Sequence, residues 1–287
     1  MLQNPIRTGL LRLRRWHEAV PLPSEIVIEP TTKCDLECPT CLHRALPSAR
    51  KGRDMSFDDY KRILNGIPTL EQVVMSGLGE PLQNREVHRM CTEAHLRGLR
   101  TKLVTNGMKV SEENAYDIIF SFDFIEISFN VATIPAIDIL LAEQPSLGTE
   151  GRLSVSVLGT PENLRVFPVI QSTLARKGIR CVLTPLENWW SEGDPSYQLV
   201  MEMVLQAGQG IVKKRFGKCR WPFTSAFISC DGEVTPCTAR MDPSRISFGN
   251  AFETPFWVIW DSEPYRSFRR DHLRGIYNRV CQGCPLE

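Results

Sequence analysis

The sequence has no strong excess of either charge and no long hydrophobic run. Its 34 Lys and Arg residues against 33 Asp and Glu residues give a formal net charge of +1 over 287 residues. Proteins that bind nucleic acid usually carry a larger positive excess, so we expect no nucleic-acid partner. No apolar stretch approaches the ~18 residues that a membrane-spanning helix needs. We therefore expect neither a nucleic-acid-binding nor a membrane-spanning protein.

An export signal is also missing. The leucines in residues 10–15 are interrupted by arginines, which breaks the apolar core that a signal peptide requires. We therefore expect a cytoplasmic protein. In a reducing compartment, clustered cysteines are more often metal ligands than disulfide partners. The cysteines are thus the first residues to explain.

Ten cysteines are present, and most of them fall into two groups. The first group lies in KCDLECPTCLHR and consists of Cys34, Cys38 and Cys41. The second group lies near the C-terminus and consists of Cys219, Cys230, Cys237, Cys281 and Cys284. Cys91 and Cys181 stand apart from both groups. Two groups of cysteines predict two metal-binding sites.

Strand and helix patterns alternate before the second group. The expected strands are residues 25–29, 72–76, 101–107, 124–130, 152–158 and 179–186, and the clearest helices are 56–67, 84–98, 111–122 and 161–178. This order predicts βαβ units and a parallel sheet. No glycine fingerprint of a dinucleotide-binding fold accompanies it, so we predict an α/β fold with a partial (β/α)6 TIM-like barrel.

The alternation ends near residue 210, which predicts a second, smaller domain. Gly, Pro, Cys and aromatic residues dominate from there on. We expect a basic N-terminal extension at residues 1–24, the barrel at 25–210, and a Cys-rich domain at 211–287. In a parallel barrel the functional loops lie at the carboxyl ends of the strands. The first cysteine group lies in such a loop, directly after the first expected strand.

Three closely spaced cysteines are compatible with two kinds of metal site. One is a zinc site that takes a fourth ligand such as His43. The other is a [4Fe–4S] cluster in which one iron has no protein ligand. Zinc sites usually pair two CxxC-like knuckles, whereas this trio forms one tight loop. The spacing therefore favours the cluster without excluding zinc.

Further motifs follow the next strands, and together with CxxxCxxC they resemble the radical S-adenosylmethionine (SAM) superfamily. In that family, three cysteines bind a [4Fe–4S] cluster whose open iron takes SAM, and reductive cleavage gives a 5′-deoxyadenosyl radical. The resemblance implies that Gly77, Gly79 and Glu80 of SGLGEPL meet the SAM ammonium group. It also implies cofactor contacts from VTNG and SFN, namely Thr105, Asn106, Ser128 and Asn130. The family usually has a bulky residue just before the third cysteine, where this chain has Thr40.

The second cysteine group allows zinc or a fully ligated [4Fe–4S] cluster by ligand count. DGEV predicts a hairpin turn that brings Cys237 back near Cys219. This region resembles the auxiliary-cluster domain of the SPASM/twitch group, in the short twitch layout of 2-deoxy-scyllo-inosamine dehydrogenase. The resemblance implies one auxiliary [4Fe–4S] cluster, held by Cys219, Cys237, Cys281 and Cys284. The expected cofactors are therefore two [4Fe–4S] clusters and SAM.

The expected reaction is a two-electron oxidation of a small molecule, with the auxiliary cluster as electron acceptor. Alternatives are a peptide-modifying maturase, or an epimerase in which a thiol returns a hydrogen atom. Cys181 and Cys230 are the candidate thiol donors, although both also fit buried core positions. A non-catalytic metal- or cluster-binding scaffold is the alternative from another class. The expected partners are a small-molecule or short peptide substrate and an electron donor such as flavodoxin or ferredoxin.

Overall fold

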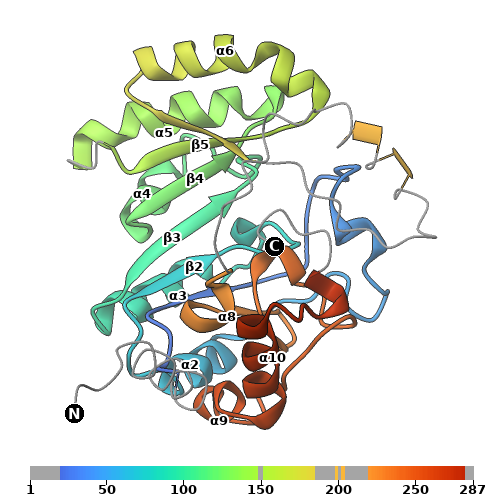
Figure 1. Ribbon diagram of the computed structural model, residues 1–287. Helices are drawn as coiled ribbons and strands as arrows, with labels where there is room; N and C mark the ends of the chain where they lie inside the picture. Colours follow the sequence, from blue (N-terminus) through green and yellow to red (C-terminus); the bar gives the residue numbers. More distant parts are fainter. Residues whose placement is uncertain (1–19, 148–150, 185–197, 200–201, 204–218, 282–287) are drawn as a thin grey trace, which may run out of the picture.

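Six parallel strands lie side by side in their chain order and form the central part of the sheet (Figure 1). The computed structural model describes residues 20–147, 151–184, 198–199, 202–203 and 219–281. The strands are β1 (Glu25–Ile28), β2 (Gln72–Met75), β3 (Arg100–Thr105), β4 (Phe124–Ser128), β5 (Leu153–Leu158) and β6 (Arg180–Thr184). Helices in the connections keep neighbouring strands parallel, as βαβ crossovers require.

The buried apolar residues of the strands fall into two clusters, one on each face of the sheet. In β4, Ile125 and Ile127 are buried in the larger cluster, which lies between the sheet and the helices. In β1, Ile26 and Ile28 belong to the same cluster, whereas Val27 points to the opposite face and packs in a smaller one. Successive side chains of a strand point to opposite faces. The smaller cluster therefore marks the inner face of the barrel, beneath the first cysteine loop.

The barrel helices are α2 (Phe57–Asn65), α3 (Val87–Leu96), α4 (Ala115–Ser121), α5 (Ile134–Leu147) and α6 (Pro161–Arg176). Ser56 begins α2 as an N-cap, because its hydroxyl accepts a hydrogen bond from the backbone N–H of Asp59 at 3.1 Å. Thr160 does the same for α6, accepting from Asn163 N at 3.2 Å. Helix α5 was not predicted, because its sequence is apolar with little helical periodicity and contains a proline, Pro145.

The C-terminal region continues the sheet instead of forming a separate layer. Strand β7 (Phe227–Ile228) pairs in parallel with β1, and β8 (Val234–Thr235) pairs antiparallel with β7. This gives an eight-stranded sheet among the described residues. The predicted hairpin is thus confirmed. Its turn contains Gly232 at φ +88°, a conformation that favours glycine.

One buried arginine joins the short helices of this region. They are α8 (Trp221–Thr224), α9 (Phe256–Trp260) and α10 (Glu263–Arg274). From α10, Arg269 donates hydrogen bonds to the carbonyls of Pro222 at 2.7 Å and Trp260 at 2.6 Å. Its guanidinium also stacks on the rings of Trp260 and Tyr265. Arg269 therefore connects all three helices.

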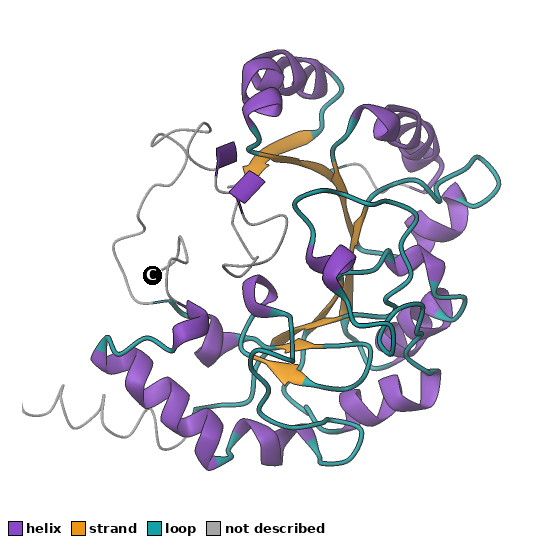
Figure 2. Ribbon diagram, turned by 90° about the vertical axis from the view of Figure 1, so that its right-hand side faces the viewer, coloured by secondary structure: helices purple, strands orange, loops and turns teal. Residues whose placement is uncertain are grey.

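The prediction of an α/β fold with a partial TIM-like barrel is confirmed. Figure 2 shows the helices in an arc outside the strands, with the loops at the carboxyl ends of the strands turned towards the viewer. The sheet does not close, because β6 and β8 are its outer strands among the residues described. Within the same residues, no helix is long and apolar enough to cross a bilayer.

Burial of the helix-facing residues should dominate the stability of the barrel. Ile127 is completely buried, so Ile127→Ala should lower the free energy of unfolding by about 2–5 kcal/mol through lost burial and a cavity. Ile276 is 59% exposed and provides the matched control, for which Ile276→Ala should change stability by less than about 0.5 kcal/mol. Urea denaturation followed by circular dichroism measures both. Equal losses would contradict this assignment of the core.

Candidate functional site

The first cysteine group lies in the loop that follows β1, on the carboxyl side of the sheet. A turn brings its members together, since Cys41 N donates to the Cys38 carbonyl at 3.1 Å. Burial, with smaller contributions from the neighbouring Cys38 and Cys34, raises the pKa of the Cys41 thiol to about 11. The backbone N–H of His43 opposes this by donating to Cys41 Sγ at 3.4 Å. Thiols that raise one another's pKa in this way become thiolates readily only when a cation binds them.

His43 is turned away from the thiols. Its Nε2 lies 2.8 Å from the backbone carbonyl oxygen of Thr32, to which it donates a hydrogen bond. Among the described residues, no three His, Cys, Asp or Glu side chains are close enough together to hold one metal ion. The thiolates of a [4Fe–4S] cluster bind separate irons, so this finding does not count against a cluster.

The glycine loop after β2, residues 76–80, packs tightly on the cysteine loop. A Cβ atom on Gly79 would lie 2.1 Å from the carbonyl oxygen of Thr31, and one on Gly77 would lie 2.6 Å from Cγ of Glu29. Both positions therefore require glycine for steric reasons. Glu80 N also donates to the Lys33 carbonyl at 2.7 Å. These contacts place the glycine loop directly beside the cysteines.

Glu80 is buried, and its carboxylate is occupied by protein donors. Thr105 Oγ1 donates to Oε1 and Asn106 N donates to Oε2, both at 2.7 Å. Leu82 N also donates to Oε1, at 3.2 Å. Burial raises the pKa of Glu80, and these hydrogen bonds oppose the rise. The carboxylate thus connects the loops after β2 and β3, a role that the glycine-glutamate motif did not indicate.

The two residues of SFN that are expected to contact the cofactor lie in two different settings. Ser128 ends β4, is exposed, and lines a cavity. Asn130 instead caps the short helix η3 (Val131–Thr133), with Oδ1 accepting from Ala132 N at 2.8 Å. Ser128 therefore lines the cavity, whereas Asn130 is not among the described residues that line it.

The cavity extends from the first cysteine group over the inner face of the barrel. Its volume is about 420 Å³. Thr40 and Cys41 line one side. The strands supply three hydroxyl groups, one carboxylate and two apolar side chains, from Ser128, Ser156, Thr184, Glu126, Val104 and Leu158. A volume of several hundred Å³ is typical of small-molecule sites. The thiol of Cys41 therefore lies at the edge of a space that can accept a ligand of this size.

An ion pair inside the barrel was not anticipated from the sequence. Lys102 of β3 and Glu126 of β4 lie on the inner face, with Lys102 Nζ donating to Glu126 Oε2 at 2.7 Å. Glu126 is the only carboxylate among the described residues that line the cavity. The signal in the sequence was one charged residue inside each of two neighbouring apolar strands, Lys102 in TKLVT and Glu126 in FIEIS. In each strand, the charged side chain points to the face opposite that of its apolar neighbours.

The two candidate thiol donors do not line this cavity. Cys230 is 3% exposed and belongs to the larger apolar cluster. Burial raises the pKa of its thiol to about 12. Cys181 lies three residues from Thr184 on β6 and so points to the opposite face, where it packs against the same apolar cluster. The placement of both thiols favours the core role over the donor role.

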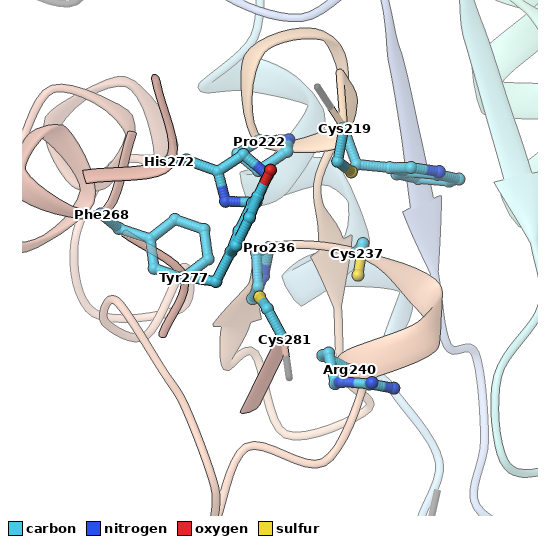
Figure 3. Close-up of a pocket in the computed structure, with 10 residues that line it drawn as sticks. Cys219, Pro222, Pro236, Cys237, Arg240, Phe268, His272, Tyr277 and Cys281 are labelled. Carbon is cyan, nitrogen blue, oxygen red and sulfur yellow. The ribbon is translucent and has the colours of Figure 1, made fainter. Parts of the chain in front are cut away.

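Three cysteines of the second group line one pocket (Figure 3). They come from separate segments: Cys219 precedes α8, Cys237 follows β8, and Cys281 ends the short helix η5 (Arg279–Cys281). Burial, with a smaller contribution from nearby Cys219, raises the pKa of Cys237 to about 12. The fourth predicted ligand, Cys284, lies outside the described residues.

The chemistry of both groups fits iron–sulfur clusters. All described cysteines are free thiols, so none of the predicted ligands described is consumed in a disulfide. The described lining of the second group's pocket consists of three thiols, apolar and aromatic residues including Tyr277, the imidazole of His272 and the guanidinium of Arg240, with no carboxylate. Thiolate ligands are soft and select iron–sulfur clusters or zinc over hard cations. The first group adds an open cavity, which a purely structural metal site does not need.

Comparisons with known proteins identify the C-terminal region and the fold. Residues 219–285 match the SPASM family model, described as an iron–sulfur cluster-binding domain. PqqA peptide cyclase of Rhodopseudomonas palustris is 33% identical over 98 residues, which cover 33% of this chain and 26% of that protein. PqqA peptide cyclase of Streptomyces rochei is 22% identical over 306 aligned residues, covering 93% of this chain and 83% of that protein.

Two solved structures share the fold at low sequence identity. BtrN in complex with AdoMet and 2-DOIA has a TM-score of 0.59 and 15% identity, covering 92% of this chain and 94% of that chain. The protein anSMEcpe with bound AdoMet and Cp18Cys peptide has a TM-score of 0.61 and 13% identity, covering 91% and 86%. At this level of identity, these similarities concern the partial barrel and the region that follows it.

The tight packing of the glycine loop leads to a test. Gly79→Ala should move the loop away from the cysteines, because its Cβ would collide with the Thr31 carbonyl. The expected result is weaker metal binding by the first cysteine group and a fall in stability of several kcal/mol, well above the ~1 kcal/mol of a simple backbone effect. Gly178→Ala is the control, since its φ is +73° but its Cβ would meet nothing within 4 Å. Iron content and urea denaturation measure both, and equal effects would contradict the packing argument.

Proposed function

Because the chain belongs to the radical SAM enzymes that carry a SPASM/twitch auxiliary iron–sulfur domain, we propose that it oxidises a small-molecule substrate by two electrons. The observation that carries the proposal is the pairing of a three-cysteine loop, whose Cys41 lines a barrel cavity, with a second thiol-lined pocket in the C-terminal region. SAM and [4Fe–4S] clusters are the cofactors of this family. When bound, they supply the radical that removes a hydrogen atom from the substrate.

In this proposal, Cys34, Cys38 and Cys41 hold the first cluster. Three protein ligands leave one iron for SAM, which explains why no fourth ligand is needed from His43. The glycine loop beside these thiols offers backbone groups to the methionine part of SAM. Glu80 acts by holding this loop and the loop after β3 in place, since three protein donors already occupy its carboxylate. Ser128 faces the ribose from β4.

The second cluster takes Cys219, Cys237, Cys281 and Cys284 as ligands. A cluster held by four protein ligands would have no iron open for substrate. It would supply an acceptor for the electron that the substrate loses after hydrogen-atom removal. Cys219 contributes to the raised pKa of the Cys237 thiol, so the two sulfurs are close, which supports a shared cation at this position. The total is two [4Fe–4S] clusters per chain.

Glu126 is the residue that we assign to accept the proton released in the oxidation. Converting a C–OH or C–NH group to C=O or C=N releases one hydrogen atom, one electron and one proton. The proton needs an acceptor within hydrogen-bond reach. Glu126 is the only carboxylate among the described cavity residues, and Lys102 fixes its orientation through Oε2. We assign the remaining oxygen, Oε1, to the substrate hydroxyl or amino group.

A second candidate function is modification of a peptide. The specific observation in its favour is the similarity to PqqA peptide cyclases, one of which aligns over 93% of this chain. Epimerisation with a thiol donor has less support, because neither Cys181 nor Cys230 lines the cavity. Mass spectrometry of the product separates the candidates: loss of two hydrogens from a small molecule supports the dehydrogenase, and a cross-linked peptide would overturn it.

Anaerobic reconstitution tests the cofactor content. We expect about eight irons and about eight sulfides per chain, as two cubane clusters require. With a reductant such as dithionite, in place of the proposed flavodoxin or ferredoxin, the protein should form 5′-deoxyadenosine from SAM. About four irons per chain would contradict the second cluster. Bound zinc without SAM cleavage would contradict the whole proposal.

Cysteine variants should separate the two clusters. Cys38→Ala should reduce SAM cleavage to background and leave about four irons, because only the first cluster is lost. Cys237→Ala should leave SAM cleavage in place and abolish the two-electron product. Cys91→Ala is the control, because Cys91 is buried in α3 away from both groups, and it should retain about eight irons. Normal product formation by Cys237→Ala would exclude the auxiliary cluster as electron acceptor.

A further inference from the structure

The loop after β3 turns an amide side chain towards the first cysteine group. Asn106 directly follows β3, and its Nδ2 lies 2.9 Å from Asp35 Oδ1 and 3.8 Å from Cys34 Sγ. The longer distance suits sulfur, which is a larger and weaker acceptor than oxygen. The NH₂ group has two hydrogens, one for each of these acceptors. The amide therefore reaches a predicted cluster ligand, not only the cofactor space that its motif suggested.

The orientation of this amide is determined by its neighbours. Asn106 Oδ1 accepts a hydrogen bond from Met108 N at 2.9 Å, while Nδ2 faces the Asp35 carboxylate. In the flipped orientation, Oδ1 would face a carboxylate and Nδ2 would face an N–H donor. Both contacts would then be repulsive. The donor end of the amide is thus the end that faces Cys34.

The backbone of Asn106 is fixed as well. Its N–H donates to Oε2 of the buried Glu80 at 2.7 Å, and the preceding Thr105 donates to Oε1. Thr105 Oγ1 in turn accepts from Gly107 N at 2.9 Å. Hydrogen bonds therefore hold the residue on both sides of its Cα. Asn106 presents its amide from a preorganised position, as a group that acts on a neighbouring ligand must.

Cys34 lies close to negative charge, because the carboxylates of Asp35 and Glu80 both act on its sulfur. Its sulfur has two donors, the backbone N–H of Leu36 and the side chain of Asn106, whereas Cys41 has the backbone donor His43 N. A hydrogen-bond donor at this sulfur offsets part of the repulsion between the Cys34 thiolate and the two carboxylates.

We propose that Asn106 is a positioning residue that raises the reduction potential of the first cluster by donating a hydrogen bond to Cys34. Reduction adds one negative charge to a cluster, and part of that charge resides on the ligand sulfurs. An N–H donor at a ligand sulfur stabilises the reduced form more than the oxidised form. Asn106 thereby makes the cluster easier to reduce in an otherwise acidic setting. The inference rests on the proposed function, because it requires a cluster at Cys34, Cys38 and Cys41.

The test is an anaerobic redox titration of the full-length reconstituted protein, followed by electron paramagnetic resonance (EPR). The signal of the first cluster is the one that changes when SAM is added. In Asn106→Ala, the ratio of reduced to oxidised first cluster at a fixed potential should fall roughly three- to tenfold, as expected for the loss of one modest hydrogen bond. Asn106→Asp keeps the shape but replaces the donor with an acceptor beside Asp35, so a larger fall is expected.

Asn114→Ala is the matched control. Asn114 braces the same loop by donating to the Lys109 carbonyl at 2.7 Å, and the structure gives it no contact with sulfur. This variant should leave the ratio unchanged, whereas a general loosening of the loop would shift it as much as Asn106→Ala does. If Asn106→Ala does not retain the cluster, Asn106→Ser, which is too short to reach Cys34, is titrated in its place with the same expectation.

The outcomes distinguish the inference from the function on which it rests. An unchanged ratio in Asn106→Ala or its substitute, with a SAM-responsive signal present, overturns the role of Asn106 alone. An equal shift in the Asn114 control overturns it too, because the effect would then be structural. If the unaltered protein has no SAM-responsive signal at all, the proposed function fails and the inference fails with it.

Discussion

The buried carboxylate of Glu29 is the interaction on which the geometry of the site depends. It follows β1 directly, is completely buried, and accepts hydrogen bonds from Leu78 N at 2.7 Å and Cys230 N at 3.1 Å. The first donor belongs to the glycine loop and the second to the C-terminal hairpin. Arg50 adds a cation at 3.5 Å and also binds Asp231. One side chain thus ties the cysteine loop, the glycine loop and the C-terminal region together, and burial raises its pKa.

The strand order of the sheet explains why Glu29 can contact both the glycine loop and the C-terminal hairpin. Strand β1 lies between β2, which leads into the glycine loop, and β7, which leads into the hairpin before Cys237. Because all three strands run in parallel, their carboxyl ends lie at the same edge of the sheet. Cys237 of the second group follows β8, which pairs antiparallel with β7, so this cysteine and the first cysteine loop are attached to one continuous sheet. An enzyme that transfers an electron from a substrate in the barrel to an auxiliary cluster needs a fixed relation of this kind.

Much of this arrangement was predictable from the sequence, because it depends on local patterns. The strands and most helices follow from hydrophobic periodicity, caps and turns, and the cysteine spacings indicate cluster chemistry. Helix α5 escaped prediction because its apolar sequence lacks a polar face. The roles of Glu80 and Asn130 were not predictable, since each depends on which donors the fold brings close. The Lys102–Glu126 pair was missed for the same reason, because its partners are 24 residues apart and meet only through strand register.

The central claim is that the open iron of a cluster at Cys34, Cys38 and Cys41 binds SAM. Electron–nuclear double resonance of the reduced protein, with SAM carrying ¹⁵N in its amino group, tests this most directly. The account predicts a hyperfine coupling between the labelled nitrogen and one cluster, and predicts that Cys38→Ala abolishes it. A reduced cluster that has no coupling to the label in the unaltered protein would contradict the account.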